Sequence, residues 1–474
     1  MIRRGEGPES HDLVVIGGGP GGYAAALYGA AAGLSVTVVE KDKVGGTCLH
    51  RGCVPAKQFL ESASVFRTVA GAKDFGVQAS QPTVDFAAAQ ARKNRVVEGL
   101  WKGLSGLMRQ RRIEVVNGTG LLLEDRVVRV AETGQELAGR SVILASGSGP
   151  RTIPGFEVDG ELVMTSDELL DLDRLPGSAA VIGGGAIGLE FASMMSDLGV
   201  QVSVLEAMPS LLAGCDPDVV AVVARSFRRR GVQVRTGVAV TGHTPAERGT
   251  TVNFEGDGGP AESVAVDAVV MAVGRRPLTE GLLAEGTGVE LDARGFVVVD
   301  EHQRTGAEAV YAVGDVVATP QLAHVGFAEA IVAVRDILGE PAAPVDYGRV
   351  PWCIYTHPEV AFAGMTEAAA LETGCDIVVS KDPLGGNSRA RILGEIDGLV
   401  KVIAERAPDG RAGRLLGVHM VGPWVTEQIG QGYLALNWEA TPDDVAHFIQ
   451  PHPTLSEAFG ETVMAMTGRG LHIG

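Results

Sequence analysis

The chain has 474 residues, and its 40 Lys and Arg against 58 Asp and Glu give a formal net charge of −18 at pH 7. Such an acidic balance disfavours binding to nucleic acid or to an anionic membrane surface. Hydrophobic residues make up 45% and charged residues 21%, which predicts a folded, multidomain protein and excludes extensive disorder. The longest apolar stretch, residues 24–39, is interrupted by glycine and polar residues, so no membrane span is expected. No apolar segment precedes the strand-like run that begins at Leu13, so no secretory leader is expected.

A βαβ pattern begins close to the N-terminus. Residues 13–40 read as an apolar strand, a glycine turn, an Ala-rich helix and a second apolar strand that ends in Glu40. The turn carries the G-x-G-x-x-G pattern as Gly17, Gly19 and Gly22. Such glycines let the backbone approach a pyrophosphate at a helix N-terminus, and the acid accepts ribose hydroxyls. The segment predicts a dinucleotide-binding module.

The same pattern recurs in residues 179–206. Gly183, Gly185 and Gly188 repeat the glycines, and Glu206 repeats the acidic residue at the same spacing. Two complete repeats make a chance match improbable, so we expect two Rossmann-like domains. Residues 207–214 contain no Arg or Lys to hold a 2′-phosphate, which favours NAD over NADP at the second module. Arginines further along the chain, at residues 225 and 228–230, are more simply read as a solvated helix face.

Five cysteines in a chain of this length indicate a reducing compartment, and we expect the cytoplasm. Cys48 and Cys53 stand close together directly after the first module. Two cysteines alone do not make a zinc or iron–sulfur site, so no metal is expected, and a disulfide closing so small a ring suits a labile redox pair. Such a pair needs a two-electron partner, and a flavin meets that need. The other cysteines are expected to be small buried side chains: Cys215, Cys353 and Cys375.

Two further segments carry groups suited to thiol chemistry. Lys57 follows Cys53 by one helical turn and could stabilise a thiolate or a reduced flavin, although a surface lysine is the simpler reading. Near the C-terminus, His452 precedes Glu457 by five residues across a turn. Histidine moves protons near pH 7, and a carboxylate can hold its ring in one tautomer. The dithiol requires such a base within reach.

Turn-rich segments near residues 145–155, 272–277 and 339–348 divide the chain. They predict an α/β protein with two Rossmann-like dinucleotide-binding domains and a C-terminal α+β domain. The expected ranges are 1–150 and 278–345 for the two parts of the first dinucleotide-binding domain, 151–277 for the second dinucleotide-binding domain and 346–474 for the α+β domain.

Five motifs together resemble one family over residues 11–465: the Cys48–Cys53 segment, the twin nucleotide motifs, TGAEAVYAVGDV, HPEVAFAGMTE and HPTLSE. The sequence is similar to the FAD-dependent pyridine nucleotide-disulfide oxidoreductases. The resemblance implies that Cys48 is the thiol that exchanges with the substrate and that Cys53 lies against the flavin. It also implies that His452 and Glu457 form a base dyad supplied by the partner subunit of a homodimer.

The resemblance assigns further roles around the cofactors. Lys57 is expected to pair with Glu190 near the flavin, Glu40 to hold the FAD ribose, and Asp315 to hold the ribityl chain. Other residues assigned to the cofactor sites are Ala323 and His324 at the flavin ring, together with Ser146 and Gly274.

Within the family, the string LAH at residues 322–324 and the missing NADP arginines resemble the lipoamide-dependent branch. That branch implies electron flow from protein-bound dihydrolipoamide to the cysteine pair, then to FAD and to NAD. The implied partner is the lipoyl domain of a 2-oxoacid dehydrogenase or glycine-cleavage complex. Three residues depart from the family pattern without removing a reacting group: His50, Ala56 and Ser146.

Two alternatives remain open. The first is another NAD(P)H-dependent disulfide reductase, glutathione- or mycothione-like, or a mercuric reductase, although the C-terminal tail lacks the cysteine pair of the latter. The second is a scaffold protein that keeps nucleotide sites without turnover. The intact set of Cys48, Cys53, His452 and Glu457 argues against a scaffold.

Overall fold

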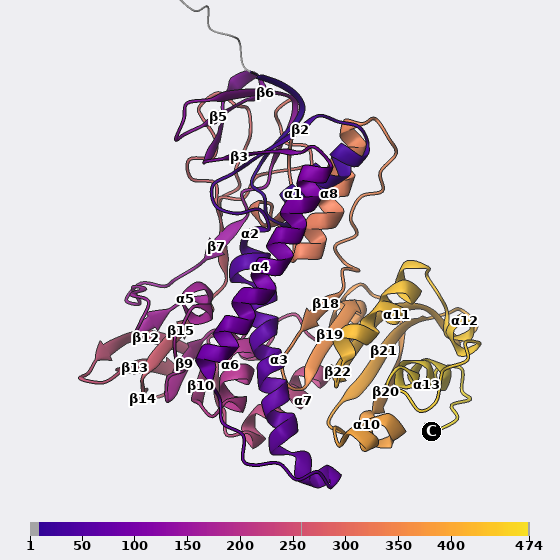
Figure 1. Ribbon diagram of the computed structural model, residues 1–474. Coiled ribbons are helices and arrows are strands. Elements are labelled where there is room, and N and C mark those ends of the chain that lie inside the picture. The colour runs from indigo at the N-terminus through magenta and orange to yellow at the C-terminus, as the bar shows by residue number, and fades with distance from the viewer. Residues whose placement is uncertain (1–8, 257, 473–474) are drawn as a thin grey trace, which may run out of the picture. The chain divides into compact units, whose positions relative to one another are not determined.

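The computed structural model describes residues 9–256 and 258–472, which divide into two compact units. The first unit comprises residues up to 58, 87–151 and 274–347, and the second comprises 59–86, 152–273 and 348 onward. Figure 1 shows that each unit contains its own β-sheets and helices. The first unit therefore brings together three segments that are distant in the sequence.

The first unit is built on a seven-stranded sheet in the order β3-β2-β1-β6-β5-β4, with β17 beside β6. Strands β1, β2, β3, β6 and β17 run parallel, whereas β5 pairs antiparallel with both β4 and β6. The strands are β1 (Glu9–Ile16), β2 (Val36–Glu40), β3 (Glu114–Asn117), β4 (Gly120–Leu122), β5 (Val127–Val130), β6 (Glu136–Leu144) and β17 (Val310–Ala312). A small antiparallel pair, β7 (Ser148–Pro150) and β16 (Arg275–Pro277), completes the strands of this unit.

Strand β1 shows why this sheet is buried on both faces. Leu13 and Val15 belong to one hydrophobic cluster, while Val14 and Ile16 belong to another. Successive side chains of a strand point to opposite faces, so the continuous apolar run fills both layers. Helix α1 (Pro20–Ala31) packs beside α8 (Ala323–Ile337), as Figure 1 also shows.

Two long helices lie at boundaries between the units in the sequence. The unit boundaries fall within α3 (Cys53–Ala70) and at the first residue of α4 (Phe86–Gln110). The short α2 (Gly46–Arg51) precedes α3. Four short 3₁₀ helices lie at η1 (Ala72–Phe75), η2 (Glu124–Arg126), η3 (Gly314–Val316) and η4 (Leu384–Gly386).

In the second unit, a parallel sheet in the order β11-β10-β9-β15-β8 repeats the nucleotide-binding architecture. Its elements are β8 (Val163–Met164), α5 (Ser166–Leu170), β9 (Ser178–Ile182), α6 (Ala186–Asp197), β10 (Gln201–Glu206), α7 (Pro217–Arg229), β11 (Gln233–Thr236) and β15 (Ala268–Met271). An antiparallel sheet follows β11 and is formed by β12 (Val238–Pro245), β13 (Thr250–Gly256) and β14 (Ala261–Val266).

The C-terminal part of the second unit is a five-stranded antiparallel sheet in the order β18-β19-β22-β21-β20. Helices α11, α12 and α13 pack against it. Its elements are β18 (Trp352–Ile354), β19 (Glu359–Gly364), α9 (Glu367–Glu372), β20 (Ile377–Pro383), α10 (Ser388–Leu393), β21 (Leu399–Arg406), β22 (Ala412–Gly422), α11 (Val425–Asn437), α12 (Pro442–Ala446) and α13 (Glu457–Ala465).

The expected fold class is confirmed: two Rossmann-like sheets and a C-terminal α+β region. Strand β17 joins the first sheet, so the segment after residue 277 returns to the first module. None of the helices in residues 9–256 and 258–472 combines the length and hydropathy of a bilayer-spanning segment.

Candidate active site

The first glycine turn joins β1 to α1 and packs tightly against neighbouring backbone because its residues lack side chains. Gly17 has φ +101°, and a Cβ on it would lie 2.2 Å from the Ala145 carbonyl oxygen. A Cβ on Gly22 would lie 1.8 Å from the Gly17 carbonyl oxygen. Helix α1 starts after Gly19 with no side-chain cap and no acidic residue in its first turn. Its first N–H groups are therefore suited to a phosphate.

Glu40 closes this turn at the end of β2. Its Oε2 accepts a hydrogen bond from the Gly18 N–H at 2.6 Å, and its Oε1 accepts one from the Asp42 N–H at 2.8 Å. A carboxylate offers about four acceptor positions, so this anchored group can still accept ribose hydroxyls. The first glycine turn and the N-terminus of α1 together form a cradle for a phosphate, here called the first glycine cradle. This cradle and Glu40 fit the adenosine half of FAD.

Asp315 lies in η3 and is held by two residues of the β7–β16 pair. Ser148 Oγ donates a hydrogen bond to Asp315 Oδ2 at 2.5 Å, and Arg275 Nε donates to Ser148 Oγ at 2.7 Å. Arg275 Nε also lies 3.7 Å from the Asp315 carboxylate. The hydroxyl of Ser146 is buried and has no partner among the described residues. An unpaired buried hydroxyl beside the Gly17 turn fits a site that a polar cofactor completes.

Ala323 and His324 are the first residues of α8. The helix has no side-chain cap at Leu322 and no acidic residue in its first turn. Gln321, just before it, has a buried side-chain Nε2 without a partner among the described residues. This helix start therefore presents backbone and side-chain donors suited to an electronegative part of a cofactor.

The second glycine turn, between β9 and α6, repeats the geometry of the first. A Cβ on Gly183 would lie 2.3 Å from the Ala272 carbonyl oxygen, and one on Gly188 would lie 2.0 Å from the Gly183 carbonyl oxygen. A Cβ on Gly185 would meet no protein atom within 4 Å, so the space beside it is open. Glu206 accepts hydrogen bonds from the backbone N–H groups of Gly184 and Met208. The second turn fits NAD in the way that the first fits FAD.

Two of the four arginines that could have reached a 2′-phosphate pair with acidic residues elsewhere. Arg229 pairs with Asp397, and Arg230 donates to Asp197 at 2.7 Å.

Gly274, assigned to the cofactor sites, lies in the first unit, and its carbonyl oxygen accepts a hydrogen bond from the Arg151 N–H at 3.0 Å.

Cys48 and Cys53 are brought together across the break between α2 and α3. Gly52 ends α2, and Cys53 is the first residue of α3. A hydrogen bond with Cys53, followed by burial and the charge on Cys53, raises the pKa of the Cys48 thiol, while Lys57 opposes this rise. The N-terminus of α3 favours a negative charge at Cys53. Both effects favour Cys53 over Cys48 as the position of the thiolate in the reduced pair.

Helix α2, which carries Cys48, is tied to the loop that precedes it. His50 Nε2 lies 3.0 Å from the Val44 carbonyl oxygen, and Arg51 pairs with Asp42. His50, one of the departures from the family pattern, thus fills a structural position, with its ring turned to the backbone. Ala56, another departure, is buried in α3.

The histidine–carboxylate pair is formed in the second unit. His452 Nδ1 lies 2.9 Å from Glu457 Oε2 at the start of α13. The His452 side chain is 66% exposed, whereas that of Glu457 is 15% exposed. An ionised carboxylate only accepts hydrogen bonds, so Nδ1 carries the proton and Nε2 is left to accept one. The exposed ring is available to a substrate or to a partner subunit.

The remaining predicted residues, Lys57 and Glu190, belong to different units. Glu190 is buried in α6, and its Oε1 accepts a hydrogen bond from the Tyr355 N–H at 2.9 Å. Their pairing stays a prediction, as do the catalytic and cofactor roles of all the residues above.

Sequence reasoning missed three residues that lie at these sites. Tyr23, in the first turn of α1, has a raised pKa because it is buried and because it lies near the charges of Cys48 and Cys53. Ser148 and Arg275 hold Asp315. Neither position carries a local motif, because their role arises only when β7 and β16 pair.

Comparison with known proteins agrees with this geometry. Residues 11–330 match the family model described as pyridine nucleotide-disulphide oxidoreductase, and residues 350–463 match the dimerisation domain of the same family. The chain belongs to the pyridine nucleotide-disulphide oxidoreductase family, and its cofactors are FAD and NAD.

Curated relatives and solved structures cover nearly the whole chain. A dihydrolipoyl dehydrogenase of Bacillus subtilis is 39% identical over 98% of this chain and 99% of its own length. One from Thermus scotoductus is also 39% identical, with the same shares covered. The crystal structure of LpdA from Mycobacterium tuberculosis has a TM-score of 0.89 at 27% identity, covering 97% of this chain and 99% of that one. The HOCl-induced flavoprotein disulfide reductase RclA from Escherichia coli has a TM-score of 0.84 at 28% identity, covering 96% and 99%.

Proposed function

We propose that this chain is a dihydrolipoyl dehydrogenase, which oxidises protein-bound dihydrolipoamide to lipoamide and reduces NAD. The observation that carries the proposal is the Cys48–Cys53 pair, placed in the same unit as the first glycine cradle and Asp315. The curated relatives of that name, 39% identical over nearly the full chain, support the choice of substrate.

The thiol exchange follows from the asymmetry of the two cysteines. A thiolate of the dihydrolipoyl group attacks the Cys48 sulfur of the disulfide, and the Cys53 sulfur leaves as a thiolate at the N-terminus of α3. The second dihydrolipoyl thiolate then attacks the substrate sulfur bound to Cys48. This step closes the lipoyl disulfide and releases Cys48, which becomes a thiol.

His452 would move the protons of this exchange, since its Nε2 is free to accept once Glu457 holds Nδ1–H. Lys57, one turn after Cys53, would stabilise the Cys53 thiolate, and Glu190 would pair with Lys57. Bound FAD would accept the two electrons of the dithiol and deliver them to NAD as a hydride. The cradle residues and Glu40 hold the adenosine half of FAD, while Glu206 holds the ribose of NAD.

The assembly proposed is a homodimer in which His452 of one subunit serves the cysteine pair of the other. The match of residues 350–463 to a dimerisation domain supports it. That region also exposes large apolar side chains, which favour burial in an interface: Trp424, Leu434, Trp438, Phe448 and Ile449. The proposed partner is the lipoyl domain of a 2-oxoacid dehydrogenase or glycine-cleavage complex. We place the enzyme in the cytoplasm because its few cysteines suit a reducing compartment.

The domain boundaries expected from the sequence are also part of this proposal. Residues 1–150 and 278–345 would form the FAD domain, 151–277 the NAD domain and 346–474 the dimerisation domain.

Steady-state turnover of the purified, FAD-loaded protein tests the proposal. We expect oxidation of dihydrolipoamide with NAD to be much faster than oxidation of NADPH with glutathione disulfide or mercuric ion. Reversed preferences would instead favour another reductase of the family. If the protein binds FAD but NADH does not reduce the flavin, the alternative of a scaffold protein without turnover would be favoured.

A further inference from the structure

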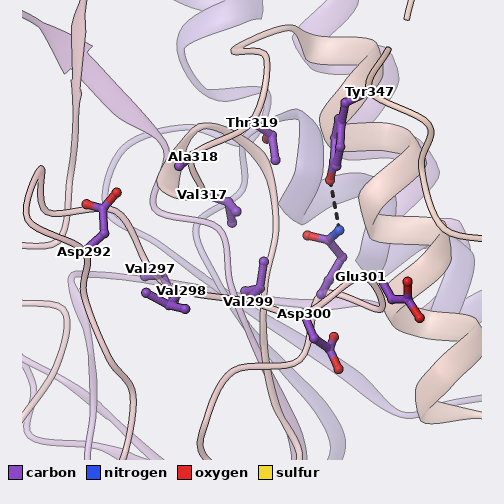
Figure 2. Close-up of a pocket in the computed structure, with 11 residues that line it drawn as sticks. Asp292, Val297, Val298, Val299, Asp300, Glu301, Val317, Ala318, Thr319 and Tyr347 are labelled. Carbon is purple, nitrogen blue, oxygen red and sulfur yellow. Dashed lines mark hydrogen bonds between the residues drawn. The ribbon is translucent and has the colours of Figure 1, made fainter. Parts of the chain in front are cut away.

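A cavity in the first unit is used by none of the residues assigned to FAD or NAD. It has a volume of about 440 Å³, within the range of small-molecule sites. Figure 2 shows its apolar wall and the carboxylates at its edge. The wall consists of Val297, Val298, Val299, Val317 and Ala318, and the acidic rim consists of Asp292, Asp300 and Glu301.

Gln303 lines this cavity and carries a buried acceptor without a partner. Gln303 is 1% exposed, and its Oε1 has no hydrogen-bond partner among the described residues. The other end of the amide, Nε2, donates to the Tyr347 hydroxyl at 3.0 Å, the bond drawn as a dashed line in Figure 2. A buried, unpaired amide oxygen at a cavity wall marks a position for a donor from a ligand.

The orientation of this amide is fixed by the groups behind it. The Tyr347 hydroxyl donates its one proton to Glu329 Oε1 at 2.9 Å, so it can only accept from Gln303. Glu329 is fully buried and also accepts from Thr319 Oγ1 at 2.7 Å and the Gly314 N–H at 2.6 Å. Turning the amide over would place its oxygen against another acceptor. Oε1 therefore stays the unpaired end.

The charges around the cavity select the sign of the ligand. Its lining contains three carboxylates and no lysine or arginine. Two arginines lie beside these carboxylates: Arg294 Nε is 3.5 Å from Asp292, and Arg304 Nη1 is 4.0 Å from Asp300. Arg304 is held mainly by Asp336, to which its Nε donates a hydrogen bond at 2.7 Å. His302 Nε2 lies 3.7 Å from Glu301, whose side chain is 72% exposed. Glu301 thus leaves most of its carboxylate to solvent and to an approaching cation.

We propose that this cavity is a second ligand site, which binds a small organic cation with a primary ammonium group on an aliphatic body. The aliphatic body packs against the valines of the wall. The ammonium donates a hydrogen bond to Gln303 Oε1 and lies among the carboxylates of the acidic rim. The proposal does not depend on which disulfide substrate the enzyme uses.

Binding of three probes to the FAD-loaded, full-length protein tests the chemistry of the site. Ligand-observed NMR titration measures the binding of each probe. Cyclohexylammonium is expected to bind saturably. N,N,N-trimethylcyclohexylammonium keeps the charge but lacks N–H donors, and we expect it to bind roughly tenfold more weakly. Cyclohexanecarboxylate, with the opposite charge, is expected not to bind. No saturable binding of cyclohexylammonium in the millimolar range, or equal binding of all three probes, contradicts the proposal.

Two variants and a control place the binding in this cavity. Gln303→Leu removes the acceptor, and Ala318→Phe adds a bulky ring at an exposed lining residue that takes no part in the Gln303–Tyr347–Glu329 network. Each is expected to weaken cyclohexylammonium binding roughly tenfold or more. Glu308→Gln removes an exposed carboxylate of the same segment that does not line the cavity, and should leave binding unchanged. Unchanged binding in Ala318→Phe overturns the assignment, even where Gln303→Leu fails to fold.

Discussion

His452 Nδ1 and Glu457 Oε2 lie 2.9 Å apart where the loop after α12 meets the first turn of α13. The same helix contributes the glutamate of a second pair of this type, in which His472 Nδ1 lies 3.0 Å from Glu461 Oε1. The two pairs have similar geometry and exposure, with the histidines 66% and 78% exposed and the glutamates 15% and 16% exposed. Only the first is assigned to catalysis, so the second is its natural control.

Loss of the first pair is therefore predicted to impair turnover specifically. His452→Gln removes the proton acceptor and should lower kcat by about 10²- to 10⁴-fold. Glu457→Gln leaves the ring without its carboxylate and should lower kcat about tenfold to a hundredfold. His472→Gln should leave kcat unchanged. Steady-state kinetics, with FAD content measured in each variant, check the prediction; equal losses in His452→Gln and His472→Gln would contradict it.

The thiols should differ strongly in reactivity. Burial and the charge of Asp216 raise the pKa of Cys215 to about 12. At pH 8, only about one Cys215 thiol in ten thousand is ionised, and its alkylation rate should rise with pH until pH exceeds about 12. In the reduced protein at pH 8, iodoacetamide should modify Cys53, at the N-terminus of α3, long before Cys215. Peptide mass spectrometry over a time course measures both rates. Faster labelling of Cys215 would refute this order.

Two glycines of the second turn allow effects on folding stability to be distinguished from effects on NAD binding. Gly185 has a backbone φ of −79°, and a Cβ on it would meet no protein atom. Gly185→Ala should cost less than about 1 kcal/mol of stability, yet its methyl group would occupy the space next to the pyrophosphate and weaken NAD binding. Gly188→Ala, whose Cβ would lie 2.0 Å from the Gly183 carbonyl oxygen, should destabilise the fold itself.

Thermal melting and NAD titration of the two variants distinguish these effects. Gly103→Ala, at an open helical position of α4, is the control for a neutral methyl group and should leave NAD affinity unchanged. If Gly185→Ala binds NAD as tightly as the unchanged protein, the pyrophosphate does not lie against Gly185.

A buried lysine should be important for stability in the second unit. Lys401 is 1% exposed, and its Nζ lies 2.8 Å from both oxygens of the fully buried Asp216. It also contacts Asp218 at 2.7 Å and Glu367 at 2.6 Å. Removing one partner of a buried ion pair leaves an uncompensated charge, so Lys401→Met should destabilise the protein by about 3–5 kcal/mol.

The matched control for that variant is Lys381→Met. Lys381 pairs with Asp218 at 2.7 Å, but its side chain is 45% exposed, so its removal should cost about 1 kcal/mol or less. Chemical denaturation of both variants measures the difference. Similar losses for Lys401→Met and Lys381→Met would show that burial does not govern this cluster.

The sequence predicted the parts of the fold and site that local patterns encode. The two βαβ units appear as β1–α1–β2 and β9–α6–β10, with Glu40 and Glu206 at equivalent strand ends. Glycine spacing and strand-terminal acids have direct backbone causes, so they could be read without a structure. The contact between His452 and Glu457 could also be expected, because the two residues are close in sequence.

What the sequence did not predict depends on contacts between distant segments. Ser148 and Arg275 meet at Asp315 only because β7 pairs with β16, and the residues come from three separate stretches. Tyr23 lies near Cys48 because the first turn of α1 comes close to α2, and no local motif indicates it. The orientation of Gln303 likewise depends on Tyr347 and Glu329, which belong to later segments. Tertiary packing alone sets these positions.

In the proposed reaction, dihydrolipoamide delivers its electrons to the flavin through Cys48 and Cys53. Anaerobic stopped-flow mixing of the FAD-loaded protein with dihydrolipoamide, without NAD, measures this half-reaction through the flavin absorbance. We expect a rapid spectral change in the unchanged protein, loss of that change in Cys48→Ser, and no effect of Cys375→Ser. Flavin reduction by dihydrolipoamide at the same rate in Cys48→Ser would show that the electrons do not pass through Cys48.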